Sequence, residues 1–305
     1  MTDGLIVVDK PAGLTSHQVV GRLRRLLGTR KVGHAGTLDP MATGVLLAGV
    51  GRATRLLGHL ALTDKSYLAT IRLGQATVTD DAEGEFTEMR GAAGVTAEQV
   101  EAAMAAYRGR ITQVPSSVSA IKINGVRSYA RVRAGEEVEL AAREVAVSRF
   151  ELRRTTQASV VGLRAGEAYS ATVLDLQVEV DCSSGTYIRA LARDLGRDLG
   201  TGGHLTRLRR TRVGPFTFDD PYLSPNGLEA EPGVRIPLIS PAQAARRCFS
   251  VIDLDEAEAI GVRHGQPLNR PVPDDPTALL AGEELLALYR PKGAGAVPVA
   301  VFVAG

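Results

Sequence analysis

The pattern of apolar positions along the chain predicts short strands with helices between them. The alternation over 170–181 predicts a long strand, because successive side chains of a strand point to opposite faces; its apolar members are Ala171, Val173, Leu174, Leu176, Val178 and Val180. Shorter apolar runs predict strands at 4–8, 45–50 and 66–73. Since strands dominate and helices lie between them, we expect an α+β fold with a mixed, largely antiparallel sheet and flanking helices.

Apolar residues at helical spacing predict five helices, at residues 17–27, 52–62, 97–107, 187–199 and 241–248. Ser16 is the expected N-cap of the first helix. Thr96 and Gln99 have the spacing of a capping box before the third. The helix at 187–199 buries its leucines on one side and leaves a basic stripe on the other, formed by Arg189, Arg193 and Arg197.

The last part of the chain has a different pattern. Prolines recur at short intervals over 220–250, which indicates a boundary. After it, short apolar runs are separated by Gly and Pro, a pattern typical of a small β-barrel. The sequence therefore predicts a large domain at 1–245 and a small C-terminal domain at 246–305.

Composition agrees with a globular protein. The chain has 305 residues, 44% apolar and 23% charged, which is enough to bury a sizeable core. No apolar run reaches the roughly 18 residues of a membrane span, and the N-terminus lacks a signal-peptide pattern, so we expect a cytoplasmic protein with no membrane partner. The two cysteines, Cys182 and Cys248, argue against a disulfide framework.

The net charge of +2 conceals an uneven distribution of charge. Residues 10–38, 102–135 and 199–218 contain many Arg and Lys residues but no acidic residue, whereas acidic residues outnumber basic ones from 220 onward. One basic cluster is often only a solvated face. Three such runs favour a track for a polyanion, whose phosphates would be bound without any reading of base sequence.

Residues 33–44 are difficult to explain by packing alone. Gly-His-Ala-Gly-Thr-Leu-Asp-Pro-Met-Ala-Thr-Gly places one carboxylate, Asp39, among glycines and other small residues, which let a ligand approach the backbone. An aspartate with the ordinary pKa of about 3.9 is ionised at neutral pH, so it needs positioning but no partner base to act as a nucleophile. Asp-Pro is also a common turn, and that alternative is open at this point.

This segment resembles the catalytic motif of the TruB-type tRNA pseudouridine synthases, Gly-x-Leu-Asp-Pro-x-Ala-x-Gly, in which the Asp is the nucleophile. Further segments match family motifs in the family's order, at residues 9–16, 65–67 with 73–74, 182–189 and 204–210. The matches cover roughly residues 4–215. The resemblance implies that 1–245 is a pseudouridine synthase catalytic domain and that 246–305 is a PUA-like module, although the C-terminal match is one of layout.

The resemblance implies isomerisation of a uridine in the T loop of tRNA, conventionally at position 55. The glycosidic C–N bond breaks, the base rotates, and a C–C bond forms at C5 of a nucleotide flipped out of its stack. Because nothing is oxidised or hydrolysed, we expect no cofactor and no metal. The expected partner is the T-arm of tRNA, with no protein partner required and a monomeric protein. The sequence does not distinguish attack of Asp39 on C1′ from attack on C6.

Individual roles also follow from the resemblance. The expected catalytic residues are Asp39, Arg189 as a bidentate partner of its carboxylate, and Tyr67 as the ring that stacks on the flipped base and relays the C5 proton. The expected substrate-binding residues are His34, Tyr187, Leu208, Lys10, Arg127 and Arg131. The last two lie in residues 116–140, which resemble an insertion that grips the T loop. As isolated residues, Tyr67 and Leu208 also fit core positions.

Two other functions are compatible with the sequence. The protein could act as a tRNA-folding chaperone with secondary catalysis, or as a guide-RNA-dependent synthase acting on ribosomal RNA. The chain lacks the lysine-rich tails typical of the second class. Its five histidines show no zinc-binding spacing, and no phosphate-binding loop or dinucleotide fingerprint is present.

Overall fold

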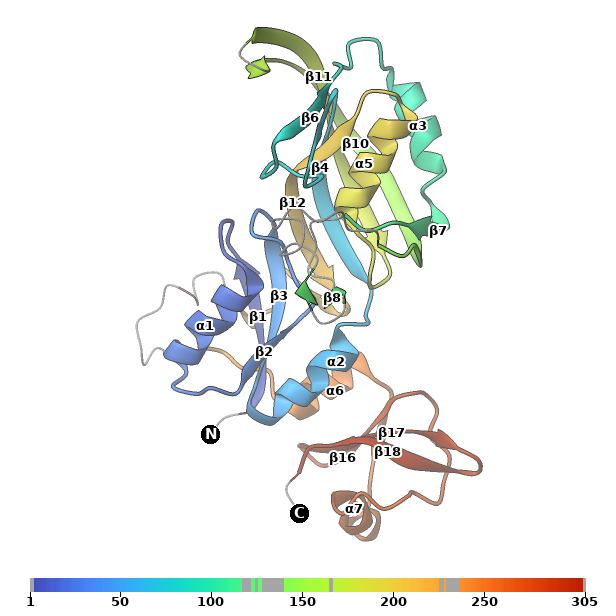
Figure 1. Cartoon of the computed structure of the whole chain (residues 1–305). Helices are drawn as coiled ribbons and strands as arrows, with labels where there is room; N and C mark the ends of the chain where they lie inside the picture. Colours follow the sequence, from blue (N-terminus) through green and yellow to red (C-terminus); the bar gives the residue numbers. More distant parts are fainter. Residues whose placement is uncertain are drawn as a thin grey trace. The chain divides into compact units, whose positions relative to one another are not determined.

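The structure, a computed structural model, is an α+β protein whose chain divides into two compact units (Figure 1). Unit 1 comprises Met1–Pro40, Gly44–Thr63 and Arg212–Gly305, and unit 2 comprises Met41–Thr43 and Asp64–Thr211. The residues that the structure describes are 3–116, 122–123, 126–127, 140–164, 167–224, 228 and 236–303. None of the helices in these ranges is both long and apolar enough to span a membrane.

Unit 1 contains a sheet around two almost completely buried strands, β1 (Gly4–Lys10) and β3 (Thr43–Val50). These two strands pair antiparallel, so that Lys10 lies opposite Gly44. Strand β2 (Val32–Ala35) pairs with β3, and β14 (Leu223–Ser224) adds to β1 in parallel. The ends of β1, β2 and β3 therefore frame the segment that carries Asp39.

The helices of unit 1 differ from the prediction in detail. Helix α1 (Ser16–Leu26) is capped by Thr15, whose hydroxyl accepts from the Gln18 amide in a complete capping box. Ser16 is not the cap, because its hydroxyl is buried and bonded to Leu38. The helix expected at 52–62 is a 3-10 turn, η1 (Gly51–Leu56), followed by one turn of α-helix, α2 (Leu57–Leu60).

The C-terminal part of unit 1 contains two helices and four strands. These are α6 (Pro241–Cys248), β15 (Val251–Asp253), α7 (Glu256–Arg263), β16 (Thr277–Ala281), β17 (Glu284–Lys292) and β18 (Gly295–Val301). The strands form one sheet in that order, with β15 parallel to β16 and the others antiparallel. In the described residues no pairing of β15 with β18 closes this sheet into the barrel that the sequence predicts.

One apolar cluster runs through most of unit 1. It joins Leu5 and Val45 of the N-terminal strands to Ala242 of α6 and to Leu280 and Leu288 of the C-terminal sheet. A second cluster packs α7 against the C-terminal sheet, with members that include Val262, Leu286 and Tyr289. Residues on both sides of position 245 thus share an interior, and the domain boundary there stays a prediction.

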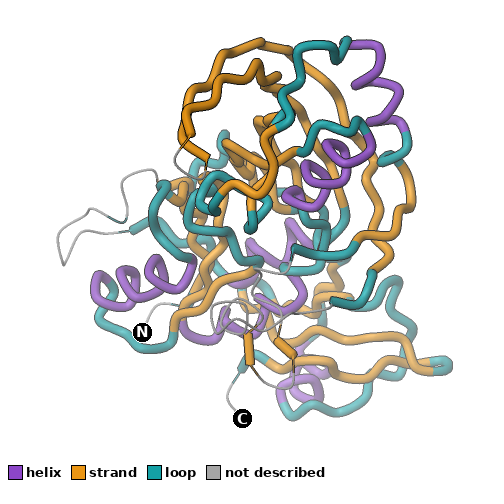
Figure 2. Tube along the Cα trace, turned by 45° about the horizontal axis from the view of Figure 1, so that its top comes forward, coloured by secondary structure: helices purple, strands orange, loops and turns teal. Residues whose placement is uncertain are grey.

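Unit 2 is built on a sheet with the order β12–β4–β11–β10–β7. The strands are β12 (Gly203–Val213), β4 (Lys65–Leu73), β11 (Glu167–Cys182), β10 (Arg143–Arg164) and β7 (Gly109–Gln113). Strands β4, β11, β10 and β7 pair antiparallel. The long β10–β11 pair is prominent among the orange strands of Figure 2. The sequence predicts β4 and β11 but not β10.

Two helices, α3 (Ala97–Ala105) and α5 (Ile188–Asp198), lie on one face of this sheet (Figure 1). The capping box of Thr96 and Gln99 is confirmed at the start of α3. Helix α5 approaches the start of β12 so closely that a Cβ on Gly196 would lie 2.2 Å from the Gly203 amide nitrogen. This contact requires glycine and fixes the end of α5 on the sheet.

Two smaller hairpins form separate two-stranded sheets. In unit 2, β5 (Gln75–Thr77) pairs with β6 (Phe86–Met89), and the turn between them carries Asp80 and Asp81. In the insertion predicted at 116–140, β8 (Lys122–Ile123) pairs with β9 (Val126–Arg127), as the Asn124-Gly125 turn signal predicts. The remainder of that insertion, including Arg131, lies outside the described residues.

Candidate active site

Asp39 lies in unit 1, half-buried, in the segment between β2 and β3. The residue before it is fixed by the buried Ser16, whose hydroxyl accepts from the Leu38 amide at 2.9 Å and donates to the Leu38 carbonyl at 3.1 Å. The residue after it is fixed by the amide of Gly13, which donates to the Pro40 carbonyl at 2.9 Å. Backbone groups of the residues on both sides of Asp39, Leu38 and Pro40, are therefore held by the segment 9–16.

Lys10 is the second support of this segment. Its side chain is 0% exposed, and its ammonium donates to the carbonyl oxygens of Pro11, Leu14 and Pro40 at 2.9, 2.6 and 3.2 Å. A buried ammonium needs such acceptors, since an unpaired buried charge is very costly. The sequence predicts that Lys10 binds substrate, but this arrangement favours a role in holding the Asp39 segment.

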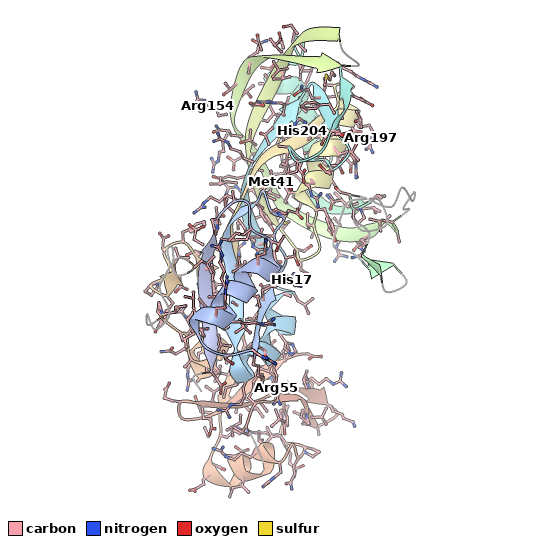
Figure 3. All side chains as sticks on the ribbon, turned by 60° about the vertical axis from the view of Figure 1, so that its left-hand side comes forward. His17, Met41, Arg55, Arg154, Arg197 and His204 are labelled. Carbon is pink, nitrogen blue, oxygen red and sulfur yellow. The ribbon has the colours of Figure 1, made fainter. Side chains whose placement is uncertain are left out.

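His34 lies on β2 of unit 1, half-buried, and contacts a second histidine. Its ring meets that of His17 edge-on, with the ring centroids 5.3 Å apart and the planes at 77°. His17 is exposed at the start of α1, where Figure 3 labels it. The ring contact joins the start of α1 to β2, the strand that leads to Asp39, and the sequence prediction missed His17.

Tyr67 lies near the start of β4 in unit 2 and is 8% exposed. In the β4–β11 ladder Tyr67 is opposite Val180, and Lys65 is opposite Cys182. Strand β11 ends at Cys182 and leads through a short turn into α5. The register therefore brings Tyr67 to the end of the sheet at which α5 begins, so two segments that the sequence singles out, 65–67 and 182–189, lie next to each other.

The neighbourhood of Tyr67 is unusually rich in buried polar groups. Lys65 is 6% exposed, and burial lowers its pKa to about 8, with the nearby charge of Arg210 acting in the same direction. Burial raises the pKa of the Cys182 thiol to about 11, so this thiol is not a nucleophile at neutral pH. Arg210 is itself only 1% exposed.

The start of α5 is held by an amide of β7. The Gln113 side chain donates to the Tyr187 carbonyl at 3.1 Å and accepts from the Tyr187 amide at 2.9 Å. Tyr187 is the N-cap position of α5 and its own side chain makes no capping bond. Gln113 is 2% exposed, so this pair fixes the backbone of Tyr187 and, with it, the first turn that carries Arg189.

Arg189 is buried in the first turn of α5, with 5% of its surface exposed. One guanidinium nitrogen, Nη1, donates to the Thr79 carbonyl at 2.9 Å and lies 3.3 Å from the Asp81 carboxylate. The Asp81 side chain is 3% exposed and also accepts from the Thr79 hydroxyl and the Glu83 amide. The turn between β5 and β6 thus orients the arginine.

The other arginines of α5 are paired with acidic residues. Arg193 contacts Asp80 at 3.2 Å and Asp194 at 3.0 Å, while Arg197 contacts Asp194 and Asp198, both at 3.1 Å. The side chain of Arg197 is 67% exposed, and Figure 3 labels it at the surface of α5. The basic stripe that the sequence predicts is therefore largely neutralised within unit 2.

Leu208 on β12 is 7% exposed, as expected of a wall or core residue. Arg127 lies on β9, and Arg131 lies outside the described residues. Within the part of the chain that the structure describes, no group of three or more His, Cys, Asp and Glu side chains could hold a metal ion.

The comparison with known families decides the class of this site. Residues 24–188 match the model of the TruB family pseudouridylate synthase N-terminal domain. Residues 189–228 match the C-terminal domain of tRNA pseudouridylate synthase B, and 249–303 match the model named tRNA pseudouridine synthase II, C terminal. The chain belongs to the TruB family. The TruB match includes Asp39, Tyr67 and Tyr187, and the chain is a pseudouridine synthase of this family.

Several relatives of this TruB protein share more than half of its residues. A protein of Cutibacterium acnes named tRNA pseudouridine synthase B is 54% identical over 95% of this chain and 94% of its own length. Proteins of the same name from Arthrobacter sp. and Thermobifida fusca are 52% and 53% identical over 99% of this chain, and 97% and 99% of their own lengths.

Solved structures support the fold assignment of the TruB chain. A chain of the Cbf5-Nop10-Gar1 complex superposes with a TM-score of 0.68 at 25% identity, over 98% of this chain and 85% of its own. A chain of an H/ACA RNP bound to a substrate RNA containing 2′-deoxyuridine gives the same TM-score at 24% identity, over 99% of this chain and 85% of its own. At this identity the second likeness shows the fold alone.

The structure gathers the predicted TruB residues in two groups. Asp39, His34 and Lys10 belong to unit 1, and Tyr67, Tyr187, Arg189 and Leu208 belong to unit 2. Sequence reasoning missed the residues that support them, of which the most important are Ser16, Gln113 and Asp81. The acidic run Asp80-Asp81 shortly before Gly84 was the available signal for Asp81, and it resembled an ordinary acidic turn.

Proposed function

We propose that this TruB protein converts one uridine in the T loop of tRNA, position 55, to pseudouridine with Asp39 as the nucleophile. The observation that carries the proposal is the anchoring of Leu38 and Pro40 by Ser16 and Lys10, which leaves Asp39 between two residues whose backbone groups are fixed. Supporting it are relatives at 51–54% identity over at least 95% of the chain that are named tRNA pseudouridine synthase B.

The reaction is an isomerisation in which atoms balance without a co-reactant. The carboxylate of Asp39 adds to C1′ or C6, the glycosidic C–N bond breaks, and the base turns so that C5 bonds to C1′. The bond between Asp39 and the substrate breaks again, which returns the free carboxylate. The proton leaves C5 and the base nitrogen gains one, so product and substrate have the same composition. No redox or hydrolytic group is required. A desolvated, oriented carboxylate supplies the nucleophile.

The other residues bind and orient in this proposal. Arg189, itself oriented by Asp81, supplies the positive charge that holds the reacting carboxylate ionised. Tyr67 stacks on the extruded base, Leu208 and Tyr187 form the pocket wall, and unstacking of the base costs a few kcal/mol. His34, with His17 beside it, contacts the RNA next to the vacated position.

The insertion and the C-terminal region complete the proposal. Arg127 and Arg131 bind T-loop phosphates, and residues 246–305 form a PUA-like region in a protein that acts as a cytoplasmic monomer. The two alternative functions have less support. Relatives above 50% identity are named for tRNA, whereas the likenesses to chains of an H/ACA RNP and of the Cbf5-Nop10-Gar1 complex lie at 24–25% identity.

The test is a reaction with the purified protein alone. An unmodified T-arm transcript is incubated with the protein in EDTA, without nucleotide, guide RNA or second protein, and pseudouridine is mapped by carbodiimide-dependent primer extension and by mass spectrometry. We expect one modified position, in the T loop. A scrambled-loop transcript with the same stem is the matched control and should stay unmodified.

Three outcomes would contradict the proposal. Absence of pseudouridine in the intact arm would refute the activity, and a requirement for guide RNA would favour the guide-dependent alternative. If the Asp39→Asn protein still corrected tRNA folding as well as wild type while wild type modified tRNA only marginally, the chaperone alternative would be favoured.

A further inference from the structure

Two residues of the turn between β5 and β6 contact the guanidinium of Arg189. The Thr79 carbonyl accepts from the guanidinium at 2.9 Å, and the Asp81 carboxylate lies 3.3 Å from the same nitrogen. Residues 79 and 81 are separated only by Asp80. The conformation of this one residue therefore decides whether both acceptors reach the arginine together.

Asp80 has the only left-handed backbone among the described non-glycine residues, with φ of 60°. This conformation is unfavourable for an ordinary side chain, and Asp and Asn tolerate it best. Strain of this kind persists only where the surroundings impose it. Here it reverses the chain between Thr79 and Asp81, so that the carbonyl of one and the carboxylate of the other converge.

The surroundings of Asp80 show what imposes this conformation. Its carboxylate accepts from the Ser116 hydroxyl at 2.6 Å and from Arg193 at 3.2 Å, and its carbonyl accepts from the Leu205 amide at 3.0 Å. Asp80 is only 8% exposed. Three separate parts of the chain, the segment after β7, helix α5 and strand β12, thus hold a single residue of the turn.

We infer that Asp80 is a positioning residue for Arg189, acting through the Thr79 carbonyl and the Asp81 carboxylate rather than by contact with substrate. The inference rests on the proposed function, in which Arg189 serves the reacting carboxylate. It assigns a purpose to a strained and buried aspartate. Ser116 and Arg193 are then the supports of Asp80, one step further from the chemistry.

Three variants separate the backbone conformation of Asp80 from the hydrogen bonds of its side chain. Asp80→Asn keeps an acceptor for Ser116 and tolerates the left-handed backbone. Asp80→Gly keeps only the left-handed backbone, and Asp80→Ala keeps neither. In single-turnover reactions on the T-arm, we expect Asn to stay within about threefold of wild type, and Gly and Ala to lose about tenfold or more. The affinity for RNA should change less than about threefold. Glu85→Gln, which removes an exposed acid of the same hairpin, is the matched control.

A double-mutant cycle with Arg189→Lys tests whether Asp80 acts through the arginine. If it does, Asp80→Ala should cost far less in the Arg189→Lys protein than in wild type, because the orientation that it supports is already lost. Ser116→Ala should reproduce part of the defect. This variant also keeps the test decisive if Asp80→Ala fails to fold.

The results distinguish this inference from the proposed function. If wild type forms no pseudouridine, the function is wrong. If wild type reacts but the rate losses of Asp80→Ala and Arg189→Lys multiply in the double variant, the positioning role is wrong and the function stands. The same holds if Asp80→Ala and Ser116→Ala both react at the wild-type rate. A loss of rate matched by an equal loss of RNA affinity would also overturn the role.

Discussion

The ammonium of Lys10 donates to the carbonyl oxygen of Pro40 at 3.2 Å, directly after Asp39. The same ammonium bonds the carbonyls of Pro11 and Leu14, so one buried charge ties the segment 9–16 to the segment that carries the nucleophile. The segments 9–16 and 33–44, which are separate motifs in the sequence, are therefore joined in the fold. The first motif is the support of the second.

Lys10→Met tests that support. The substitution keeps the apolar stem but leaves buried carbonyl groups without their donor, which costs about 1–3 kcal/mol in the free energy of unfolding. The single-turnover rate should fall with little change in RNA affinity, because the segment loses its position rather than an RNA contact. Urea unfolding and reaction rates measure both effects. Lys292→Met, at the exposed end of β17, is the control. A loss confined to RNA affinity would instead support the substrate contact that the sequence predicts.

Lys65 should make stability depend on pH in the alkaline range. Burial lowers its pKa from 10.5 to about 8 in the folded protein, so between these values the unfolded chain binds more protons than the folded one. The free energy of unfolding should therefore rise with pH across this window, and Lys65→Met should lack that rise. Urea unfolding of both proteins below and within the window measures the difference. Parallel pH profiles would show that Lys65 does not titrate in this range.

Arg189→Lys should slow the reaction without abolishing it. Lysine keeps the positive charge but cannot form the planar, two-pronged contacts of a guanidinium, and Asp81 and Thr79 are placed for the guanidinium. The single-turnover rate should fall by about tenfold or more, with RNA affinity nearly unchanged. A loss of RNA affinity at a normal rate would identify Arg189 as an RNA-binding residue.

Binding of tRNA should weaken steeply with salt. Each phosphate contact lowers the logarithm of the binding constant by somewhat under one unit for each tenfold rise in salt. Neutralising Arg127 and Arg131 together should flatten that slope, whereas Arg290→Gln, an exposed arginine of β17, should not. Filter binding over a range of salt concentrations gives the slopes. An unchanged slope in the Arg127/Arg131 variant would place the RNA elsewhere.

Much of the fold follows from local patterns, and the exceptions have physical causes. Strand β11 was predictable because apolar and polar residues alternate over 170–181 with a single break, at Val173-Leu174. Strand β10 was not, because its register shifts between Val147 and Arg149 and again between Leu152 and Arg154. Each shift exchanges the odd-numbered and even-numbered positions that face a given side of the sheet, so the strand shows no continuous alternation. The C-terminal strands were predictable as runs, but their closure depends on pairings that a run of apolar residues does not encode.

The candidate site divides in the same way. Asp39, Tyr67 and Arg189 could be proposed because their types and order match a family motif. Their supports could not, since the bond of Ser16 to Leu38 and that of Arg189 to Asp81 join residues far apart in the chain. An acidic pair such as Asp80 and Asp81 has the composition of a solvated turn, and only the fold shows both to be buried.

The most direct test of the central claim is the single-turnover rate of the Asp39→Asn protein on a T-arm transcript. Asparagine keeps the shape of the side chain and leaves the anchored residues Leu38 and Pro40 in place, but it cannot act as a carboxylate nucleophile. We expect no detectable pseudouridine, an unchanged melting temperature, and RNA affinity within about tenfold, or 1.4 kcal/mol, of wild type. Turnover by this variant at even about a tenth of the wild-type rate would make Asp39 a turn residue and contradict the mechanism.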